Sequence, residues 1–375
     1  MLSILTIYLA VVAVPGNAMN IFKNDFEQQW EELFKDVNKL NEYTKARPVE
    51  LRGVDIDNYR INEVIFTGAT FDGVTWKNVS AKKSRFIKVI FKNCTFEDVN
   101  FEDSIMTDVT FENCKIHYSN FSGCTMVRSC FRDCDIVETA LDGTDGDILR
   151  VDKCSIKTRS AFSGSKIQFE FRDTNMHDVN MMGLNGGYPL LIEGGTLSEV
   201  DFGKSHFSTV TLRRVKQGEG GVKFNDITAK SVTFESVDMT HGTAIARSRV
   251  KSVIVNGGNF GTTFDDSIIG AIYVRDAELY YMEFSEVKLP KVTISNCKLY
   301  DTGLYDGFIE EFSVYNSEFN IIVGDNFKAD TVVWDNVTLD GKIDLTNAHV
   351  EDFQVTRLKR GPKLQLITTG SNLKF

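Results

Sequence analysis

The amino-acid sequence predicts an all-β solenoid, in which the chain winds into coils that stack along one axis. Two observations lead to this fold class, and both come from the stretch between Val64 and Leu141. Every fifth residue there is apolar, and the residue two positions before each of them is small or β-branched. The apolar series consists of Phe66, Phe71, Trp76, Ala81, Phe86, Phe91, Phe96, Phe101, Met106, Phe111, Ile116, Phe121, Met126, Phe131, Ile136 and Leu141.

The five-residue period distinguishes this stretch from ordinary secondary structure. Charged residues are frequent in it, yet none falls on either series, so two positions of every five are predicted to point inward. An amphipathic helix repeats about every 3.6 residues and a strand about every 2, so neither has this period. A short fixed period is typical of a solenoid, whose coils bury apolar positions only against the coils above and below.

The repeat resembles that of the pentapeptide-repeat proteins. In that family a small residue, a polar residue, a central Leu or Phe and two outward polar residues follow one another. The segments Cys94 to Asp98 and Val99 to Asp103 both have this order. The resemblance implies a right-handed parallel β-helix with quadrilateral coils, four pentapeptides to the coil.

The β-helix is predicted to occupy residues 48–367 as one body, because no single compact core limits the length of a solenoid. We expect it to be regular over 61–143, looped and less regular over 144–272, regular over 272–305, and irregular from there to 367. A basic segment begins at Arg357, and residues 368–375 form a tail. Glycine-rich segments predict turns or loops at Asn185 to Pro189, Glu193 to Gly195 and Gln217 to Gly221, and a loop at Gly257-Gly258.

Residues 1–18 resemble a secretory signal peptide, since an apolar run is followed by small residues at Gly16 and Ala18. The protein is therefore expected to be periplasmic or secreted, with no membrane span after cleavage, whereas translation from Met19 would leave it cytoplasmic. Residues 19–47 predict a capping helix, because apolar residues recur at helical spacing from Asn20 to Ala46. Such a helix would cover the open end of the first coil.

The cysteine spacing predicts buried, reduced thiols, although several cysteines in an exported chain would ordinarily suggest disulfides. Cys94, Cys114, Cys134 and Cys154 are spaced by twenty residues, which is one turn of a four-sided coil. Adjacent coils would hold these side chains about 4.8 Å apart, too close for favourable disulfide geometry. Cys130 lies outside this series and is expected to be the most exposed thiol.

No catalytic site, metal site or cofactor is predicted. The five histidines are isolated, and the chain lacks metal-ligand spacing, nucleophile motifs and phosphate-binding loops. The carboxylates of Asp142 to Asp147 suit a solvated turn or a calcium site, and the missing EF-hand spacing favours the turn. The net charge of −10 disfavours nucleic acid and anionic membranes as direct partners and favours a basic protein.

Exposed tyrosines give the candidate binding site. Tyr280 and Tyr300 each follow an apolar-series residue and are twenty residues apart, so they would stack on one outer face, with Tyr305 on the adjacent face. Tyrosine is enriched among the residues that dominate binding energy at interfaces. The same side chains would also serve to cover coil edges, and the sequence leaves both interpretations open. A partner is expected to bind within residues 184–315, where glycine-rich loops and these tyrosines occur together.

These features predict a non-enzymatic, exported binding protein that presents a rigid acidic surface to a protein partner. One concrete form is an immunity protein that neutralises a bacterial toxin. There are two alternatives. Some pentapeptide-repeat proteins mimic DNA and bind type II topoisomerases, which would suit a cytosolic chain. Other β-helices are polysaccharide-acting enzymes. The partner's identity and the oligomeric state do not follow from the sequence.

Overall fold

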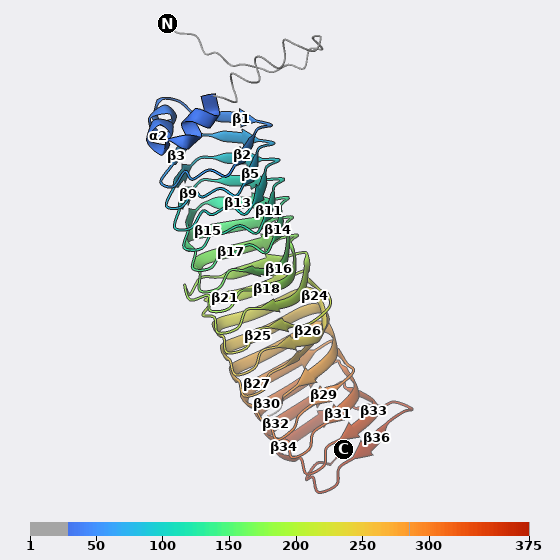
Figure 1. Ribbon diagram of the computed structural model, residues 1–375. Helices are drawn as coiled ribbons and strands as arrows, with labels where there is room; N and C mark the ends of the chain where they lie inside the picture. Colours follow the sequence, from blue (N-terminus) through green and yellow to red (C-terminus); the bar gives the residue numbers. More distant parts are fainter. Residues whose placement is uncertain (1–28, 285, 375) are drawn as a thin grey trace.

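Residues about twenty positions apart stack on one another, and this register winds the chain into a long parallel β-solenoid (Figure 1). The computed structural model describes residues 29–284 and 286–374. The solenoid has about 16 turns, and two short helical segments lie at its N-terminal end. The predicted fold class, a β-solenoid with an N-terminal helical cap, is confirmed.

Each coil has four sides, which we name after one early coil. Side A holds residues 65–67, side B 70–72, side C 75–77 and side D 80–82. Sides A, B and C carry short strands in the first coils, while side D is joined by isolated bridges such as Ser80 to Asn100. These first strands are β1 (Glu50–Arg52), β2 (Asp55–Asp57), β3 (Ile65–Thr67), β4 (Thr70–Asp72), β5 (Thr75–Lys77), β6 (Arg85–Ile87), β7 (Ile90–Lys92), β8 (Thr95–Glu97), β9 (Ile105–Thr107), β10 (Thr110–Glu112), β11 (Lys115–His117), β12 (Thr125–Val127), β13 (Ser129–Arg132) and β14 (Asp135–Val137).

From residue 145 onward many strands are longer, because they continue around the corners between sides. The middle strands are β15 (Asp145–Asp152), β16 (Ser155–Ala161), β17 (Lys166–Arg172), β18 (Asn175–Asn180), β19 (Leu190–Glu193), β20 (Thr196–Asp201), β21 (Thr209–Arg213), β22 (Lys216–Gln217), β23 (Val222–Lys223), β24 (Thr228–Ala244), β25 (Arg249–Thr263) and β26 (Ile268–Glu283). The last strands are β27 (Lys288–Ser295), β28 (Lys298–Leu299), β29 (Thr302–Gly303), β30 (Phe308–Tyr315), β31 (Glu318–Val323), β32 (Lys328–Asp335), β33 (Thr338–Asp344), β34 (His349–Thr356), β35 (Lys359–Arg360) and β36 (Gln365–Ile367).

The corners explain why Asn, Asp and Gly recur at fixed positions. A corner residue adopts positive φ, which these residue types tolerate best. Between sides B and C, Asn93, Asn113 and Asp133 have φ of 54°, 52° and 53°. Their side chains also bond along the column, as where Asn113 Nδ2 donates to Asn93 Oδ1 at 2.8 Å. The same corner in later coils has Asn336 Nδ2 donating to Asn316 Oδ1 at 3.0 Å.

The interior of the first coils is a column of stacked aromatic rings. Phe71, Phe91, Phe111 and Phe131 follow one another with ring centroids 5.1, 4.9 and 4.7 Å apart. Every residue of the two inward series predicted between Val64 and Leu141 is buried. The five-residue pattern therefore identified the core of these coils correctly.

The cysteines are free thiols, and all except Cys130 are buried. The Cys94 thiol donates to the Phe71 carbonyl oxygen at 3.3 Å, and the Cys114 thiol donates to that of Phe91 at 3.4 Å. Burial raises the pKa of Cys124 to about 12. The cysteine column thus serves the core as small side chains that also satisfy backbone carbonyls.

The N-terminal cap consists of two helical segments rather than the single helix that the sequence predicted. Residues 29–35 form the first, and α2 (Val37–Ala46) forms the second. The chain breaks at Asp36, whose extended backbone and side chain cap α2 by accepting from Asn38 N at 3.0 Å and Lys39 N at 3.2 Å. Residues 19–28 of the expected helix, like the signal peptide predicted at 1–18, lie outside the described residues.

Asparagine amides pair with the open strand edges on side A at both ends of the solenoid. At the N-terminal end, Asn41 of α2 accepts from Ile65 N at 2.7 Å and donates to Glu63 O at 3.1 Å. At the C-terminal end, Asn372 accepts from Val350 N at 2.9 Å and donates to Val350 O at 2.7 Å. Each amide takes the place of a missing strand, so these edge groups do not remain unpaired.

One of the four predicted glycine segments is a corner within a strand instead of a loop. Gly194 and Gly195 form a turn that connects β19 to β20 with φ of 72° and 81°, as predicted. Gly257 and Gly258 lie inside β25, where φ is 70° and 88°. The prediction of a loop at Gly257-Gly258 was wrong because a glycine pair also suits a strand that turns a corner. The segments at 185–189 and 218–221 do lie outside strands, as expected.

Candidate functional site

Tyr280 and Tyr300 lie at the outer end of side C in neighbouring coils. Their rings are stacked with centroids 4.8 Å apart and an interplanar angle of 27°. Both hydroxyls donate to the same Oε2 of Glu278, each at 3.2 Å. Tyr280 is 38% exposed, and Tyr300 is half-buried. The stacking expected from the twenty-residue spacing is therefore present, and Glu278 holds the pair in place.

A second tyrosine pair lies around the corner on side D. The Tyr281 hydroxyl donates to Glu283, and Glu283 is the register partner of Gly303. The Tyr305 ring lies over Gly303, so a Cβ at that glycine would come within 2.7 Å of the ring. Tyr281 and Tyr305 are 42% and 38% exposed. Tyr305 thus occupies the face adjacent to Tyr280, as the sequence predicted.

These residues form one surface that turns a corner of the solenoid. We call it the tyrosine-carboxylate face and define it as Glu278, Tyr280 and Tyr300 on side C with Tyr281, Glu283, Asp301 and Tyr305 on side D. The strand alternation explains its composition, because residues two apart in a strand point to the same side. Tyr280 follows Glu278 by two positions, and Glu283 follows Tyr281 by two. This spacing was visible in the sequence, but the paired glutamates were not predicted as site residues.

The electrostatics of this face favour a cationic partner, although Lys298 lies between Glu278 and Glu318 in the side C register. The hydrogen bond to Glu278 is the largest cause that raises the pKa of Tyr280 above its usual value. Partial burial, followed by the charge of Glu283, raises the pKa values of Asp265 and Asp301. A positive group placed beside these carboxylates would lower their pKa values again and stabilise the charged forms.

Tyr315 does not belong to this face. It lies on side B, where its register partners are Ser295 and Asp335.

Side B also carries a feature that was not predicted from the sequence, a column in which the sign of charge alternates from coil to coil. The members of this charge ladder, in register order, are Arg52, Asp72, Lys92, Glu112, Arg132, Asp152, Arg172, Glu193, Arg213 and Glu235.

Neighbours in the charge ladder attract one another. Arg213 Nε lies 2.6 Å from Glu235 and its Nη1 lies 3.8 Å from Glu193, while Lys92 Nζ lies 3.8 Å from Glu112. Opposite charges on adjacent strands stabilise a sheet weakly, and like charges there destabilise it. The ladder therefore neutralises side B along the first coils. Counting in twenties from Arg52 would have revealed its first members in the sequence.

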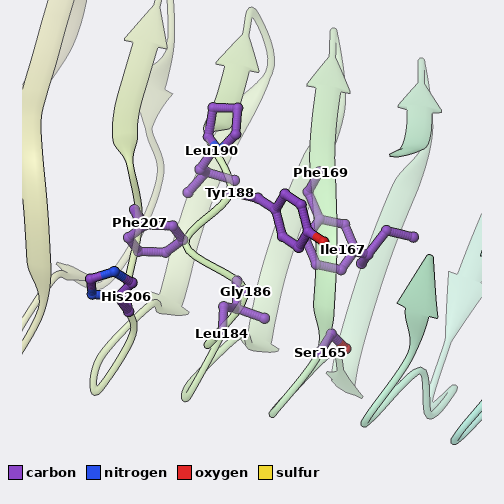
Figure 2. Close-up of a pocket in the computed structure, with 10 residues that line it drawn as sticks. Ser165, Ile167, Phe169, Leu184, Gly186, Tyr188, Leu190, His206 and Phe207 are labelled. Carbon is purple, nitrogen blue, oxygen red and sulfur yellow. The ribbon is translucent and has the colours of Figure 1, made fainter. Parts of the chain in front are cut away.

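A small cavity lies on side A where the strand ladder is interrupted at residues 185–189 (Figure 2). Its walls include Ile167, Phe169, Leu184 and Phe207, and Tyr188 from the irregular segment lies beside them. The free space is about 10 Å³, which is about the room that one water molecule needs. The cavity is too small for an organic ligand and reflects the local loss of a strand.

The remaining candidate groups have local partners. The turn expected over Asp142 to Asp147 is confined to residues 142–143, and β15 begins at Asp145. Asp145 accepts from Gly146 N at 2.7 Å, and Asp147 accepts from Arg128 N of the neighbouring coil at 2.8 Å. His117 lies 3.3 Å from Asp135. Across the described ranges, His, Cys, Asp and Glu side chains form no group of three that could hold a metal ion. No helix within those ranges is long and apolar enough to cross a membrane.

Comparison with known proteins identifies the family. A model of the pentapeptide repeat region matches residues 44–121 and 84–158. Residues 44–158 of the chain therefore belong to the pentapeptide-repeat family. This matched part begins in α2 and runs through the regular coils, and it ends where the strands start to continue around corners. No curated protein matches the chain.

Several solved structures are similar to the chain at low identity. HetL, a pentapeptide repeat protein involved in heterocyst differentiation regulation from the cyanobacterium Nostoc sp. strain PCC 7120, is 10% identical and gives a TM-score of 0.32, with 64% of this chain and 94% of HetL covered. QnrB1, a plasmid-mediated fluoroquinolone resistance protein, is 14% identical with a TM-score of 0.25, over 46% of this chain and 90% of its own. A PL6 alginate lyase is 8% identical with a TM-score of 0.19, over 88% of this chain and 83% of its own. Scores this low carry no information about function.

Proposed function

We propose that this pentapeptide-repeat protein is a non-enzymatic binding protein that presents its tyrosine-carboxylate face to a basic protein partner. One observation carries the proposal: Tyr280 and Tyr300 are stacked, partly exposed and bonded to the same carboxylate of Glu278. Tyrosines at interfaces supply large apolar contacts together with a polar group. The neighbouring carboxylates add a charge that favours a cationic contact.

The rigidity of the solenoid supports binding through this face. Tyr280 extends from β26, a strand that pairs with the coils on either side of it. Stacking and hydrogen bonds already fix the tyrosine rotamers before any partner arrives. Association normally costs about 0.5–1.5 kcal/mol for each flexible side chain that becomes ordered. Preorganised tyrosines reduce that cost, so a modest contact area suffices for specific binding.

We further propose that the protein is exported and acts as an immunity protein against a bacterial toxin. The apolar segment from Leu2 to Val14 followed by Gly16 and Ala18 supports export to the periplasm or beyond. An acidic surface would suit a basic toxin as partner. Sequencing the mature N-terminus from an exported fraction tests this part. A chain that stays in the cytoplasm and begins at Met19 would contradict export.

The charge ladder argues against the alternative of a DNA mimic. Duplex DNA carries a continuous negative charge, about one for every 1.7 Å of axis. Side B alternates in sign from Arg52 to Glu235 and therefore lacks that uniform potential. The charge pattern thus favours a partner that recognises one local face over a partner that binds along the rod.

The proposal is tested by changing the tyrosine pair together. A partner is first captured from an extract of the producing strain, and its affinity is then measured by calorimetry. We expect Tyr280→Ala with Tyr300→Ala to weaken binding roughly thirtyfold, or about 2 kcal/mol, as for interface hot spots. The matched control is Tyr118→Ala, since Tyr118 is 52% exposed on the regular coils far from this face. Unchanged affinity in the double variant would contradict the proposal.

A further inference from the structure

Side A, opposite the tyrosine pair, carries exposed cations in the two coils before the pair and in the coil of Tyr300, while Asp266 and Glu286 are exposed at its corner with side D. On side A, Lys230, Arg249, Lys251 and Lys288 are exposed. They have no ion-pair partner among residues 29–284 and 286–374. Lys291 lies beside them and pairs with Glu311 at 2.6 Å. We call this surface the basic face. Its charge is unusual in a chain whose net charge is −10.

The centre of the basic face is apolar. Ile268 is 63% exposed, the largest exposure of any large hydrophobic side chain in the described part of the chain. In the register it lies directly between Arg249 and Lys288. The positions next to it on this side are Gly270 and Ala271, which leave the surface around Ile268 flat. An exposed apolar group flanked by cations in the coils on both sides has the composition of a docking surface for an acidic, partly apolar partner.

The molecule itself carries a surface of that chemistry. The tyrosine-carboxylate face begins on side C, opposite side A, and arises from coils that overlap those of the basic face. Both faces repeat once per coil, with the spacing of about 4.8 Å that neighbouring strands share. Two copies of one solenoid therefore have matched axial spacing, so several cation-carboxylate contacts would form in register. An unrelated partner would match this spacing only by coincidence.

We propose that the basic face of one molecule docks on the tyrosine-carboxylate face of a second copy. This inference rests on the proposed function, because it assigns the basic partner of that face to another molecule of the same chain. Ile268 would contact the stacked rings of Tyr280 and Tyr300, and Lys251 and Lys288 would lie near Glu278 and Glu283. The contact is heterologous, since each molecule uses a different face toward each neighbour.

A heterologous contact between opposite sides does not close on itself. Each molecule keeps one free face after the first contact, so association continues into side-by-side arrays as concentration rises. The net negative charge of the chain opposes this association at long range. At physiological salt the Debye length is about 8 Å, so contacts between the facing charges outweigh repulsion between distant ones. Much higher salt would screen the contacts as well and dissolve the arrays.

Sedimentation velocity of the full chain tests the inference. We expect the weight-average mass to rise with protein concentration beyond twice that of the monomer, and to return to the monomer value in high salt. Lys251→Glu with Lys288→Glu should abolish this rise. The matched control is Lys83→Glu with Lys88→Glu, which makes the same change in net charge on exposed residues of the regular coils. The control should associate like the unchanged protein.

Mixing two defective variants distinguishes a heterologous contact from a symmetric one. The variant Lys251→Glu with Lys288→Glu keeps its tyrosine-carboxylate face, and Tyr280→Ala with Tyr300→Ala keeps its basic face. Alone, each should remain monomeric. Mixed in equal amounts, they should form a dimer and stop there, because the outer face of each is defective. Failure to form that dimer, while the unchanged protein associates, would overturn the heterologous contact.

A monomer at every concentration in low salt would overturn the whole inference. It would leave the proposed function intact if another basic protein still bound the tyrosine-carboxylate face in calorimetry. Loss of that binding in the absence of self-association would overturn both. If the basic face instead binds an unrelated acidic protein while the chain itself stays monomeric, the second copy is not the partner.

Discussion

The regular coils around β3 to β14 differ from the coils around β24 to β31 in both core and surface. The first region is built around stacked phenylalanines, and its charge ladder on side B alternates in sign. The second region has an aliphatic core on side B, with Val255 paired to Val274 and Val274 to Ile294. Its surface gathers exposed cations on side A and tyrosines with carboxylates on sides C and D, although Lys298 also lies on side C. One fold thus supports a neutralised surface and a polarised one.

The comparison teaches that the outward positions of a solenoid are free to differ while the inward positions keep one pattern. Inward residues must fit the coils above and below, so they remain apolar or small throughout. Outward residues meet only their column neighbours and solvent. Selection for stability favours alternating charges in a column, whereas selection for binding favours like charges grouped on one side. The second region is therefore where recognition is expected.

The largest expected effect comes from the aromatic core. Phe111 has ring neighbours at 4.9 and 4.7 Å, so Phe111→Ala should lower the free energy of unfolding by about 3–5 kcal/mol. Leu279 is equally buried in the second region, and Leu279→Ala should cost less because no stacked rings are lost. Guanidinium unfolding followed by circular dichroism measures both. A larger loss for Leu279→Ala would show that ring stacking adds nothing to the first region.

The next effect concerns the corners of the second region. A Cβ at Gly258 would overlap the carbonyl oxygen of Val237 in the adjacent coil, whereas a Cβ at Gly257 would make ordinary contacts with Ser236 Oγ at 3.6 Å and the Asp276 carbonyl oxygen at 3.7 Å. Gly258→Ala should therefore lower the free energy of unfolding by about 1–3 kcal/mol more than Gly257→Ala does. Both have positive φ, so the difference isolates the close approach of two coils. Thermal unfolding measures both variants. Equal losses of stability would mean that the backbone around Gly258 shifts to make room for the added Cβ.

Buried thiols provide a pH test that compares the two regions. Burial raises the pKa of Cys124 to about 12 and that of Cys297 to about 11. A raised pKa means that the folded state favours the protonated thiol, so this contribution to stability is full below the ordinary thiol pKa of about 8.5 and is lost as pH rises through these values. Serine occupies the same column next to each cysteine, at Ser104 and Ser317.

We therefore expect Cys124→Ser and Cys297→Ser to fold and to reduce the loss of stability between pH 9 and 11, relative to the unchanged chain. Denaturation midpoints measured across that range provide the comparison. Cys130 is the internal control, because it is only partly buried and Cys130→Ser should leave the alkaline loss unchanged. An identical alkaline loss in all the variants would mean that other groups cause it.

The smallest effect is expected from the charge ladder. Arg213 lies between Glu193 and Glu235, and Arg213→Glu would place three like charges in a row. We expect a small fall in the denaturation midpoint at low ionic strength that disappears in high salt, because exposed charge pairs contribute little and are screened. Arg213→Gln separates lost attraction from new repulsion. A fall that persists in high salt would point to lost packing of the arginine stem instead.

The sequence allowed the core and the order of sides to be predicted because each pentapeptide repeats the same local rule. Phe91 and Phe111 follow that rule, so their burial could be inferred without the structure. The glycine pair at 257–258 was misinterpreted because loops and corners both need positive φ. The break at Asp36 was missed because apolar spacing alone does not reveal a cap. The basic face was missed because coils there vary in length, with Arg249 paired to Ile268 and Ile268 to Lys288.

The candidate site was predictable in part. The spacing of Tyr280 and Tyr300 predicted their stacking, since both occupy the same position of the coil. The role of Glu278 depends on side-chain direction and hydrogen bonding across two coils, which the pentapeptide pattern does not encode. The contact of the Tyr305 ring with Gly303 also depends on the absence of a Cβ at that glycine, and the pentapeptide pattern does not predict this contact.

The charge ladder also has a consequence for how such a protein can change in length. The core of the regular half repeats with every coil, but the sign of the ladder repeats only with every second coil, as from Asp72 to Glu112. Removing one coil would keep the core intact and bring Asp72 next to Glu112. Removing or duplicating two coils would preserve both patterns. In this half a pair of coils is therefore the smallest segment whose removal or duplication preserves both the core and the charge alternation. We expect related chains of different length to differ here by two coils at a time.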